Sequence, residues 1–140
     1  MDEDEARRRF AAGRVGRLAT VTAQGAPHVV PVVFALVDDV AYTAVDGKPK
    51  TTNRLQRVAN VAATGRAGLL VDEYAEDWTS LWWVRFDGSA EVLAAGSTEA
   101  SSAVEALTRK YSQYLGDQPP GPVIAVRLAM WRSWEATPTP

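Results

Sequence analysis

Short apolar runs separated by turn residues fill the first third of the chain. Residues 15–21 and 27–37 are rich in valine and alanine, and Gln24-Gly25 between them is a turn signal. We therefore predict two strands joined as a hairpin, followed by a third strand over residues 40–45. Proline cannot donate a ladder hydrogen bond. The two prolines of the second run thus predict a sheet edge, a bulge or a place where something other than a strand approaches.

The second half of the chain repeats the strand pattern at greater length. Three further apolar runs predict strands, at residues 68–74, 81–93 and 122–130 with an extension into Trp131 and Trp134. Asp87-Gly88 interrupts the middle run and predicts a turn or a bulge at that point.

Three segments carry the apolar spacing of a helix with one buried face. The first covers residues 2–12 and places acidic side chains before arginines, the order that complements a helix dipole. The second begins near residues 51–52. The third runs from a cap at residues 97–98 to Gly116.

The resulting order is helix, three strands, helix, two or three strands, helix and strand. This order lacks the regular alternation of strand and helix that a doubly wound parallel sheet requires. We predict a mainly β (α+β) fold, an antiparallel barrel with peripheral helices, in a single domain spanning residues 1–140.

Composition and charge narrow the chemistry. The net charge of -2 and pI near 5.4 provide no general field for nucleic acid or an anionic membrane. The absence of cysteine and the single histidine argue against a metal site. The charged start is unlike a secretory signal, and no apolar run approaches the ~18 residues of a membrane span. We expect a cytoplasmic protein with no metal, nucleic-acid or membrane partner.

Lys48-Pro49-Lys50 is the densest candidate binding motif, because it directly precedes a predicted helix start at Thr51 that carries Arg54. A helix N-terminus offers free N–H groups and partial positive charge, so two adjacent lysines would create a receptor for a phosphate. The alternative is a lysine-solubilised turn.

Tryptophan is the second signal, with five in 140 residues. Adjacent residues of a strand face opposite sides, so Trp82 and Trp83 cannot both fill one core. A partner or a ligand must then cover the second face. Core packing with a homodimer interface would also explain the tryptophans.

His28 is the only side chain with an ordinary pKa near neutrality, which makes it a weak proton-donor candidate beside Tyr42. No partner pattern surrounds it, so the simpler interpretation is a strand histidine with a satisfied hydrogen bond. The carboxylates at residues 72–77 match neither a calcium loop nor a glycosidase pair and are expected in a solvated loop.

Taken in order, several segments resemble the pyridoxamine-phosphate-oxidase-like split-barrel family, and within it the F420-dependent class. These segments are GRLATV at 16–21, QGAPHVVPVVF at 24–34, YTAVDGKPK at 42–50, LQRVAN at 55–60, LLVDEY at 69–74, DW at 77–78, LWWVRFDGSA at 81–90, KYSQY at 110–114 and WRSW at 131–134. The resemblance implies an FMN-binding type of split barrel that forms a homodimer with two sites at the subunit interface. It does not extend to the C-terminal substrate-binding residues of true pyridoxamine-phosphate oxidases, which argues against vitamin B6 oxidation.

The resemblance also implies the cofactor-binding residues. The ring would lie against Pro31, Val32, Val33 and Phe34, in a groove lined by Tyr42, Thr43, Ala44 and Val45. The phosphate or anionic tail would meet Lys48, Pro49, Lys50, Thr51 and Arg54. The part contributed across the interface would include Trp82, Trp83 and Arg85, with Trp131 and Trp134 as further candidates.

The implied function is an F420-dependent oxidoreductase that transfers a hydride between the deazaflavin and an unsaturated small organic electron acceptor. No side chain needs to be a nucleophile, since the cofactor carries the redox chemistry. Two alternatives stay open: an FMN-binding oxidase or reductase of the same fold, and a non-enzymatic carrier of F420 or a related heterocycle.

Overall fold

The computed structural model describes residues 1–45 and 55–137, which form seven strands, three α-helices and two short 3-10 turns. The strands are β1 (Gly16–Val21), β2 (Pro27–Val32), β3 (Ala35–Val37), β4 (Val40–Ala44), β5 (Arg66–Glu73), β6 (Trp82–Leu93) and β7 (Val123–Glu135). The helices are α1 (Glu3–Ala12), α2 (Gln56–Thr64) and α3 (Thr98–Lys110), and the turns are η1 (Trp78–Ser80) and η2 (Ser112–Tyr114).

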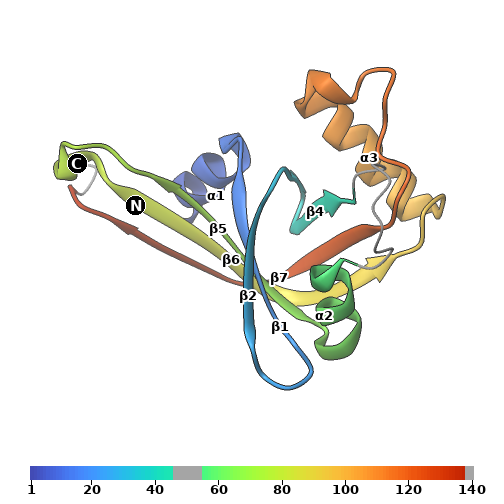
Figure 1. Cartoon of the computed structure of the whole chain (residues 1–140). Helices are drawn as coiled ribbons and strands as arrows, with labels where there is room; N and C mark the ends of the chain where they lie inside the picture. The colour runs from blue at the N-terminus through green and yellow to red at the C-terminus, as the bar shows by residue number, and fades with distance from the viewer. Residues whose placement is uncertain (46–54, 138–140) are drawn as a thin grey trace.

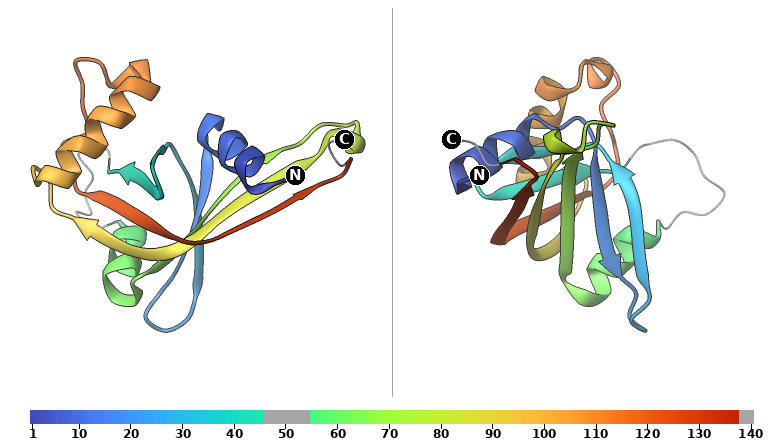
Figure 2. Two further views of the ribbon diagram at one scale, coloured as in Figure 1. Left: turned by 180° about the vertical axis from the view of Figure 1, so that it is seen from behind. Right: turned by 90° about the vertical axis from the view of Figure 1, so that its left-hand side faces the viewer.

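All strand pairs are antiparallel, in the order β2-β1-β5-β6-β7-β4-β3. Figure 1 shows that β6 and β7 are long and curve through the whole molecule, so the sheet curls instead of lying flat. The views in Figure 2 show α2 and α3 near one end of these two strands and α1 near the other. This is the antiparallel split barrel with peripheral helices that the sequence predicts.

A bulge lets β6 and β7 bend. Their register shifts between Asp87 and Gly88, as the sequence predicted. A Cβ at Gly88 would collide with the backbone of Arg127, so the two strands approach more closely there than another residue would allow.

Phe10 of α1 joins the parts of the barrel. Its ring is fully buried and lies 4.9 Å from the ring of Phe34, 5.5 Å from Phe86 and 5.3 Å from Trp131, centroid to centroid. Asp2 caps the helix by accepting a hydrogen bond from the Glu5 amide. A second buried cluster lies between α3 and the β3–β4 end of the sheet, and contains Leu107 and Tyr111.

The sheet confirms most of the predicted strands and corrects several limits. β2 is an edge strand, as its prolines predicted. The predicted single strand over residues 27–37 is wrong, because β2 ends at Val32 and β3 begins at Ala35. Two hydrogen bonds at the C-terminal end of α3 hold this break: the Phe34 amide donates to the Tyr111 hydroxyl, and the Lys110 ammonium donates to the Phe34 carbonyl.

Both internal helices also differ from prediction. α2 begins at Gln56, not near residues 51–52, since Leu55 is its extended N-cap residue. α3 is capped by Ser97 as predicted but ends at Lys110, and not at Gly116, because Tyr111 has an extended backbone and η2 follows. Among the described residues, no helix is both long and apolar enough to cross a membrane.

Candidate functional site

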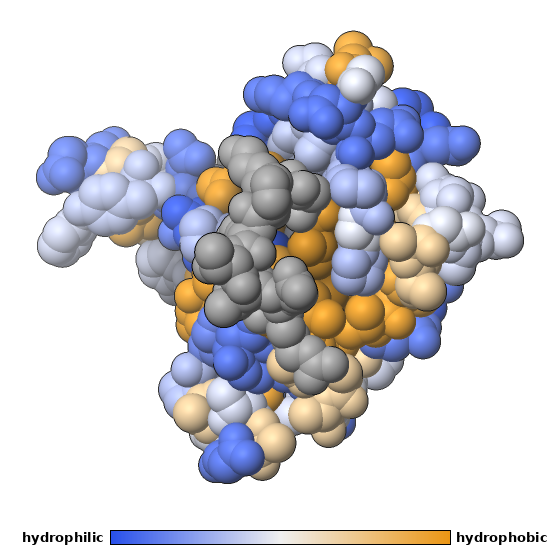
Figure 3. Space-filling model, turned by 45° about the vertical axis from the view of Figure 1, so that its right-hand side comes forward, coloured by the Kyte–Doolittle hydropathy of each residue, from blue (hydrophilic) through white to orange (hydrophobic). Residues whose placement is uncertain are grey.

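A surface pocket of about 330 Å³ lies where β2 ends and β4 passes beneath α3. We refer to this pocket as the groove. Its lining residues are Val15, Pro31, Val32, Val33, Thr43, Ala44, Arg57 and Tyr114. Figure 3 shows the face on which α2 and α3 lie, with apolar surface exposed near its centre and hydrophilic surface above it. Arg57 is the one charged side chain among the described lining residues.

Five residues predicted to contact the ring are brought together in the groove: Pro31, Val32, Val33, Thr43 and Ala44. Pro31 and Val32 are the last two residues of the edge strand β2, and Val33 is the first residue of the break that follows it. β4 supplies the other two through its pairing with β7. Val45 follows β4, and its amide donates a 3.0 Å hydrogen bond to the Pro122 carbonyl.

Phe34 and Tyr42 have other contacts. The Phe34 ring is fully buried against Phe10, with the Lys110 ammonium 3.9 Å from its centroid. Tyr42 is buried next to α3 and donates a 2.7 Å hydrogen bond to Glu99. Burial, and then this hydrogen bond to Glu99, raise the pKa of Tyr42 to about 12, which makes it a poor proton donor.

Hydrogen bonds with Tyr111 and Lys110 hold the break at Phe34. The Phe34 amide donates to the Tyr111 hydroxyl at 3.2 Å, and Lys110 Nζ donates to the Phe34 carbonyl at 2.9 Å. The Tyr111 hydroxyl also lies 3.0 Å from the Phe34 carbonyl and 3.1 Å from the Arg14 carbonyl, so its one proton serves either acceptor. Burial, and then the Arg14 charge, lower the pKa of Lys110 to about 8.

Lys48, Pro49, Lys50, Thr51 and Arg54 lie outside the described residues, so their predicted contact with an anionic tail stays a prediction. α2, which follows them, has no side-chain cap on its first turn. Arg57, on the first turn of α2, brings a positive charge to the groove independently of that motif.

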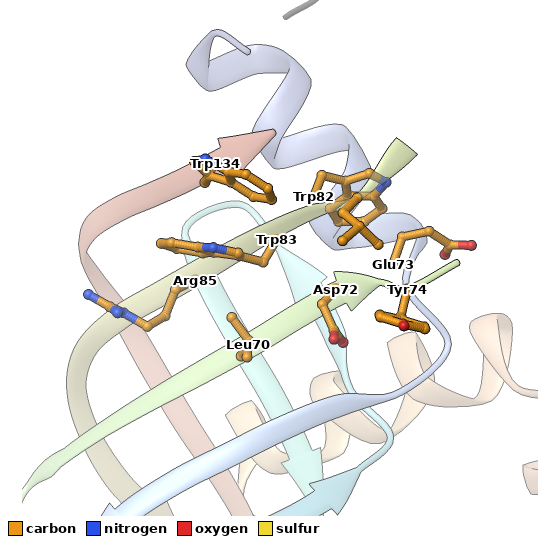
Figure 4. Close-up of a pocket in the computed structure, with 9 residues that line it drawn as sticks. Leu70, Asp72, Glu73, Tyr74, Trp82, Trp83, Arg85 and Trp134 are labelled. Carbon is orange, nitrogen blue, oxygen red and sulfur yellow. The ribbon is translucent and has the colours of Figure 1, made fainter. Parts of the chain in front are cut away.

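A second pocket of about 370 Å³ lies on the outer face of β5, β6 and β7, and we call it the aromatic pocket (Figure 4). Its lining residues are Leu70, Asp72, Glu73, Tyr74, Leu81, Trp82, Trp83, Arg85 and Trp134. Trp83 pairs with Trp134 across β6 and β7, and the two side chains lie next to each other in Figure 4. The Arg85 guanidinium lies 5.8 Å from the Trp83 ring centroid and bonds both carboxylate oxygens of Asp87.

The two neighbouring tryptophans of β6 face opposite sides, as predicted. Trp82 is partly buried and packs against the core, with the Arg9 guanidinium 5.3 Å from its ring, and its remaining surface lines the aromatic pocket. Trp83 belongs to the outer face. Trp131 is a core residue that contacts Phe10 and Phe86, whereas Trp134 is 47% exposed.

The groove and the aromatic pocket are separate within one chain. The strand register places Pro31 opposite Arg17, Arg17 opposite Leu70, and Leu70 opposite Arg85. Three strand spacings separate Pro31 from Arg85, or about 14 Å. The outer face of the sheet, on which Pro31 and Arg85 both lie, exposes the large apolar side chains Val21, Val29 and Met130 in addition to Trp134.

His28 lies on β2 opposite Thr20, so its predicted strand position is confirmed. Its Nδ1 is buried and has no hydrogen-bond partner within residues 1–45 and 55–137, contrary to the satisfied hydrogen bond that we expected. In that same part of the chain, no group of three or more His, Asp or Glu side chains is placed to hold a metal.

Comparison with known proteins identifies the family. Residues 2–135 match the family described as pyridoxamine 5′-phosphate oxidase, and the chain belongs to it. It is 34% identical over 85 residues to a 5a,11a-dehydrotetracycline/5a,11a-dehydrooxytetracycline reductase of Streptomyces rimosus subsp. rimosus. This match covers 60% of the chain and 58% of the reductase, so the chain spans just over half the length of that relative.

Solved structures share the fold at low sequence identity. A conserved hypothetical protein of Mycobacterium tuberculosis superposes with a TM-score of 0.77 at 20% identity, over 97% of this chain and 86% of that one. An FAD-binding protein of Mesorhizobium loti has a TM-score of 0.73 at 22% identity, over 95% and 94%. The heme storage protein HutZ of Vibrio cholerae has a TM-score of 0.72 at 14% identity, over 95% and 93%.

Three lining residues of the groove were not among the predicted cofactor-binding residues: Val15, Arg57 and Tyr114. Arg57 lies on the first turn of α2. The direction in which its side chain projects depends on how α2 packs beside β1, and the sequence alone does not show this packing. Tyr114 falls within the third helix as the sequence predicted it, from residues 97–98 to Gly116. It instead lies in η2, past the end of α3, where it can reach the groove.

Proposed function

We propose that this protein is a homodimeric oxidoreductase that binds coenzyme F420 in the groove and reduces an unsaturated small organic molecule. The observation that carries the proposal is the groove itself, in which valine, proline and alanine side chains meet the polar side chains of Thr43 and Tyr114 and one guanidinium among its described lining residues. A flat heterocycle with an anionic tail matches this combination, because apolar walls contact the ring faces and Arg57 attracts the tail. Family membership and the reductase relative support redox chemistry.

The chain's own residues would bind and orient the cofactor. When bound, a deazaflavin supplies hydride transfer, and the protein's part is to fix the ring face and its distance from the acceptor. Pro31, Val32 and Val33 would contact one side of the ring, and Thr43 and Ala44 would limit its depth. The predicted contacts of Lys48 and Lys50 with the tail belong to the same proposal.

A second copy of the chain would complete the site. The groove opens to solvent, while Trp83, Trp134 and Met130 lie on an outer face with exposed apolar surface. Two ion pairs on this face lie within the chain, Arg17 with Asp72 at 3.0 Å and Arg85 with Asp87 at 2.9 Å, and the exposed side chains of Arg66 and Arg132 lie on the same face. An apolar patch with a polar rim is suited to burial against an identical face.

A binding comparison tests the cofactor. F420 and FMN are titrated separately against the purified protein, with fluorescence as the signal. We expect F420 to bind more tightly, and Lys48→Ala and Lys50→Ala to weaken its binding with little loss of stability. Exposed Arg109→Ala is the control, since it removes a cation from α3 outside the groove. If the wild type and the Lys48→Ala, Lys50→Ala and Arg109→Ala variants all bind F420 with equal affinity, the predicted contacts with its tail are contradicted.

FMN or a related flavin is the second candidate, which the FAD-binding neighbour favours. A yellow protein with a flavin spectrum, purified from a host without F420, would support it. To separate an enzyme from a carrier, reduced F420 is mixed with the protein and with quinones, nitro compounds, unsaturated lactones or a dehydrotetracycline. An enzyme oxidises F420 only with an acceptor present, whereas a carrier binds it without acceptor-dependent oxidation.

A further inference from the structure

We propose that Tyr111, assisted by Lys110, is a positioning residue that holds the groove in the shape required for its flat ligand. This inference rests on the proposed function of the groove. Neither side chain lines the groove, and neither needs to touch a ligand. Both act through the backbone groups that they bind.

The Tyr111 hydroxyl joins two chain segments that are distant in sequence. It accepts from the Phe34 amide at 3.2 Å, and its proton goes to the Phe34 carbonyl at 3.0 Å or the Arg14 carbonyl at 3.1 Å. The residue after Arg14 is Val15 and the residue before Phe34 is Val33. Both valines line the groove, so one hydroxyl fixes two of its walls.

Tyr111 also supports a third wall. Its ring makes an edge contact with Tyr114, with centroids 6.3 Å apart and planes at 75°. Tyr114 lines the groove. The Tyr111 side chain is 5% exposed, so water competes little for its hydrogen bonds.

Lys110 reinforces the same point. Its ammonium donates to the Phe34 carbonyl at 2.9 Å and lies above the Phe34 ring, while the carbonyl of Lys110 accepts from Arg14 Nη2 at 3.1 Å. Arg14 in turn lies over the Tyr111 ring, 4.5 Å from its centroid. The break between β2 and β3 is therefore held from the end of α3 by two side chains and not by a sheet ladder.

A loosened break would lower the fraction of molecules with a binding-competent groove. The apparent dissociation constant rises as that fraction falls, so a groove that is competent a tenth of the time binds about tenfold more weakly. We therefore expect Tyr111→Phe, which removes only the hydroxyl, to weaken binding of F420 or FMN, whichever the wild type binds, about tenfold.

Ser97→Ala is the matched control. Ser97 caps the other end of α3 by accepting a hydrogen bond from the Ala100 amide, so its loss destabilises the same helix without touching the groove. We expect this variant to bind as the wild type does. Lys110→Met, which keeps an apolar stem and leaves Tyr111 in place, should weaken binding about threefold.

Two readouts separate positioning from general stability. At saturating ligand, the visible circular dichroism induced in the bound ring should fall in Tyr111→Phe and stay unchanged in Ser97→Ala. Hydrogen exchange at the Phe34 amide should quicken in the ligand-free Tyr111→Phe variant. If this variant does not fold, Lys110→Met provides the same two readouts at the same carbonyl.

The outcomes distinguish the two proposals. If the wild type binds neither F420 nor FMN, the proposed function fails and this inference fails with it. If the wild type binds one of them and Tyr111→Phe shows the same affinity and the same induced dichroism, the positioning role alone is overturned. If Ser97→Ala loses as much affinity as Tyr111→Phe, the effect belongs to α3 as a whole and the positioning role is also overturned.

Discussion

The groove and the aromatic pocket are built in opposite ways. Buried hydrogen bonds shape the groove: Tyr111 and Lys110 hold the break before β3, and Asn60 of α2 donates to Thr20 of β1 at 3.0 Å. The aromatic pocket lies on a continuous ladder of β5, β6 and β7, with Trp134 almost half exposed. The first region is preorganised within one chain. The second displays apolar surface that one chain leaves in water, which is why we propose that a second copy covers it.

The largest effect should come from the side chain that supports both regions. Phe10→Ala removes a fully buried ring in contact with Phe34 on the groove side and with Trp131 and Phe86 on the other. We expect a loss of about 3 to 5 kcal/mol in the free energy of unfolding, measured by urea denaturation. Phe10→Leu should cost less. A loss below about 1 kcal/mol for the alanine variant would mean that the two regions do not depend on α1.

The next effect should appear in association and not in folding. Trp134→Ser removes an exposed ring from the centre of the proposed interface, so we expect the dimer dissociation constant to rise about thirtyfold. Sedimentation velocity over a concentration series measures this. Leu115→Ser is the control, because Leu115 is also a large exposed apolar side chain, 68% exposed, and lies outside the aromatic pocket. An equal shift in both variants would argue against this interface.

A smaller effect should be confined to the groove. Arg57→Gln removes the positive charge of the described lining and leaves a shorter, neutral polar side chain. We expect about tenfold weaker binding of the anionic cofactor, with a reduced dependence on salt. Arg66→Gln, an exposed position on β5, serves as the comparison and should bind normally. Titration at low and at high salt tests both, and a salt dependence that Arg57→Gln leaves intact would place the anion elsewhere.

The smallest effect should be a pH dependence of stability that originates at α3, on the groove side of the molecule. The fold lowers the pKa of Lys110 from its ordinary 10.5 to about 8, so the unfolded chain binds more protons between these values. The free energy of unfolding should therefore rise as the pH increases from 8 toward 10. Above pH 10, Tyr42 has the opposite effect on the free energy of unfolding. Its pKa is raised from 10.0 to about 12, so the stability that the neutral phenol contributes is lost as the pH rises from 10 toward 12. Urea unfolding at several pH values tests this, and Lys110→Met should abolish the rise.

The sequence predicted the strands more reliably than it predicted the groove. Periodicity and turn residues are local signals, so the first hairpin, the bulge at Asp87-Gly88 and the opposite orientation of Trp82 and Trp83 could be predicted. The break in residues 27–37 could not, because the group that stabilises it is Tyr111, 77 residues away from Phe34. A run of valines cannot show where a distant hydroxyl will replace a ladder bond.

Only part of the candidate site could be predicted, because some of its residues depend on contacts between segments that are distant in the sequence. The resemblance placed Pro31, Val32 and Val33 in one groove with residues of β4, and the structure brings them together. It also grouped Phe34 with them, yet the alternation of the chain turns that ring toward Phe10 in the core. Arg57 and Tyr114 depend on how helices dock, which a single sequence does not encode locally.

Cofactor titration across the monomer–dimer transition tests the central claim most directly. F420 binding is measured at protein concentrations below and above the dissociation constant of the dimer, in the wild type and in Trp134→Ser. If a second copy completes the groove, each protomer of the dimer binds one cofactor, affinity falls on dilution, and Trp134→Ser binds weakly until its concentration is raised. Equal affinity at every concentration, in a protein that stays monomeric, would contradict the account.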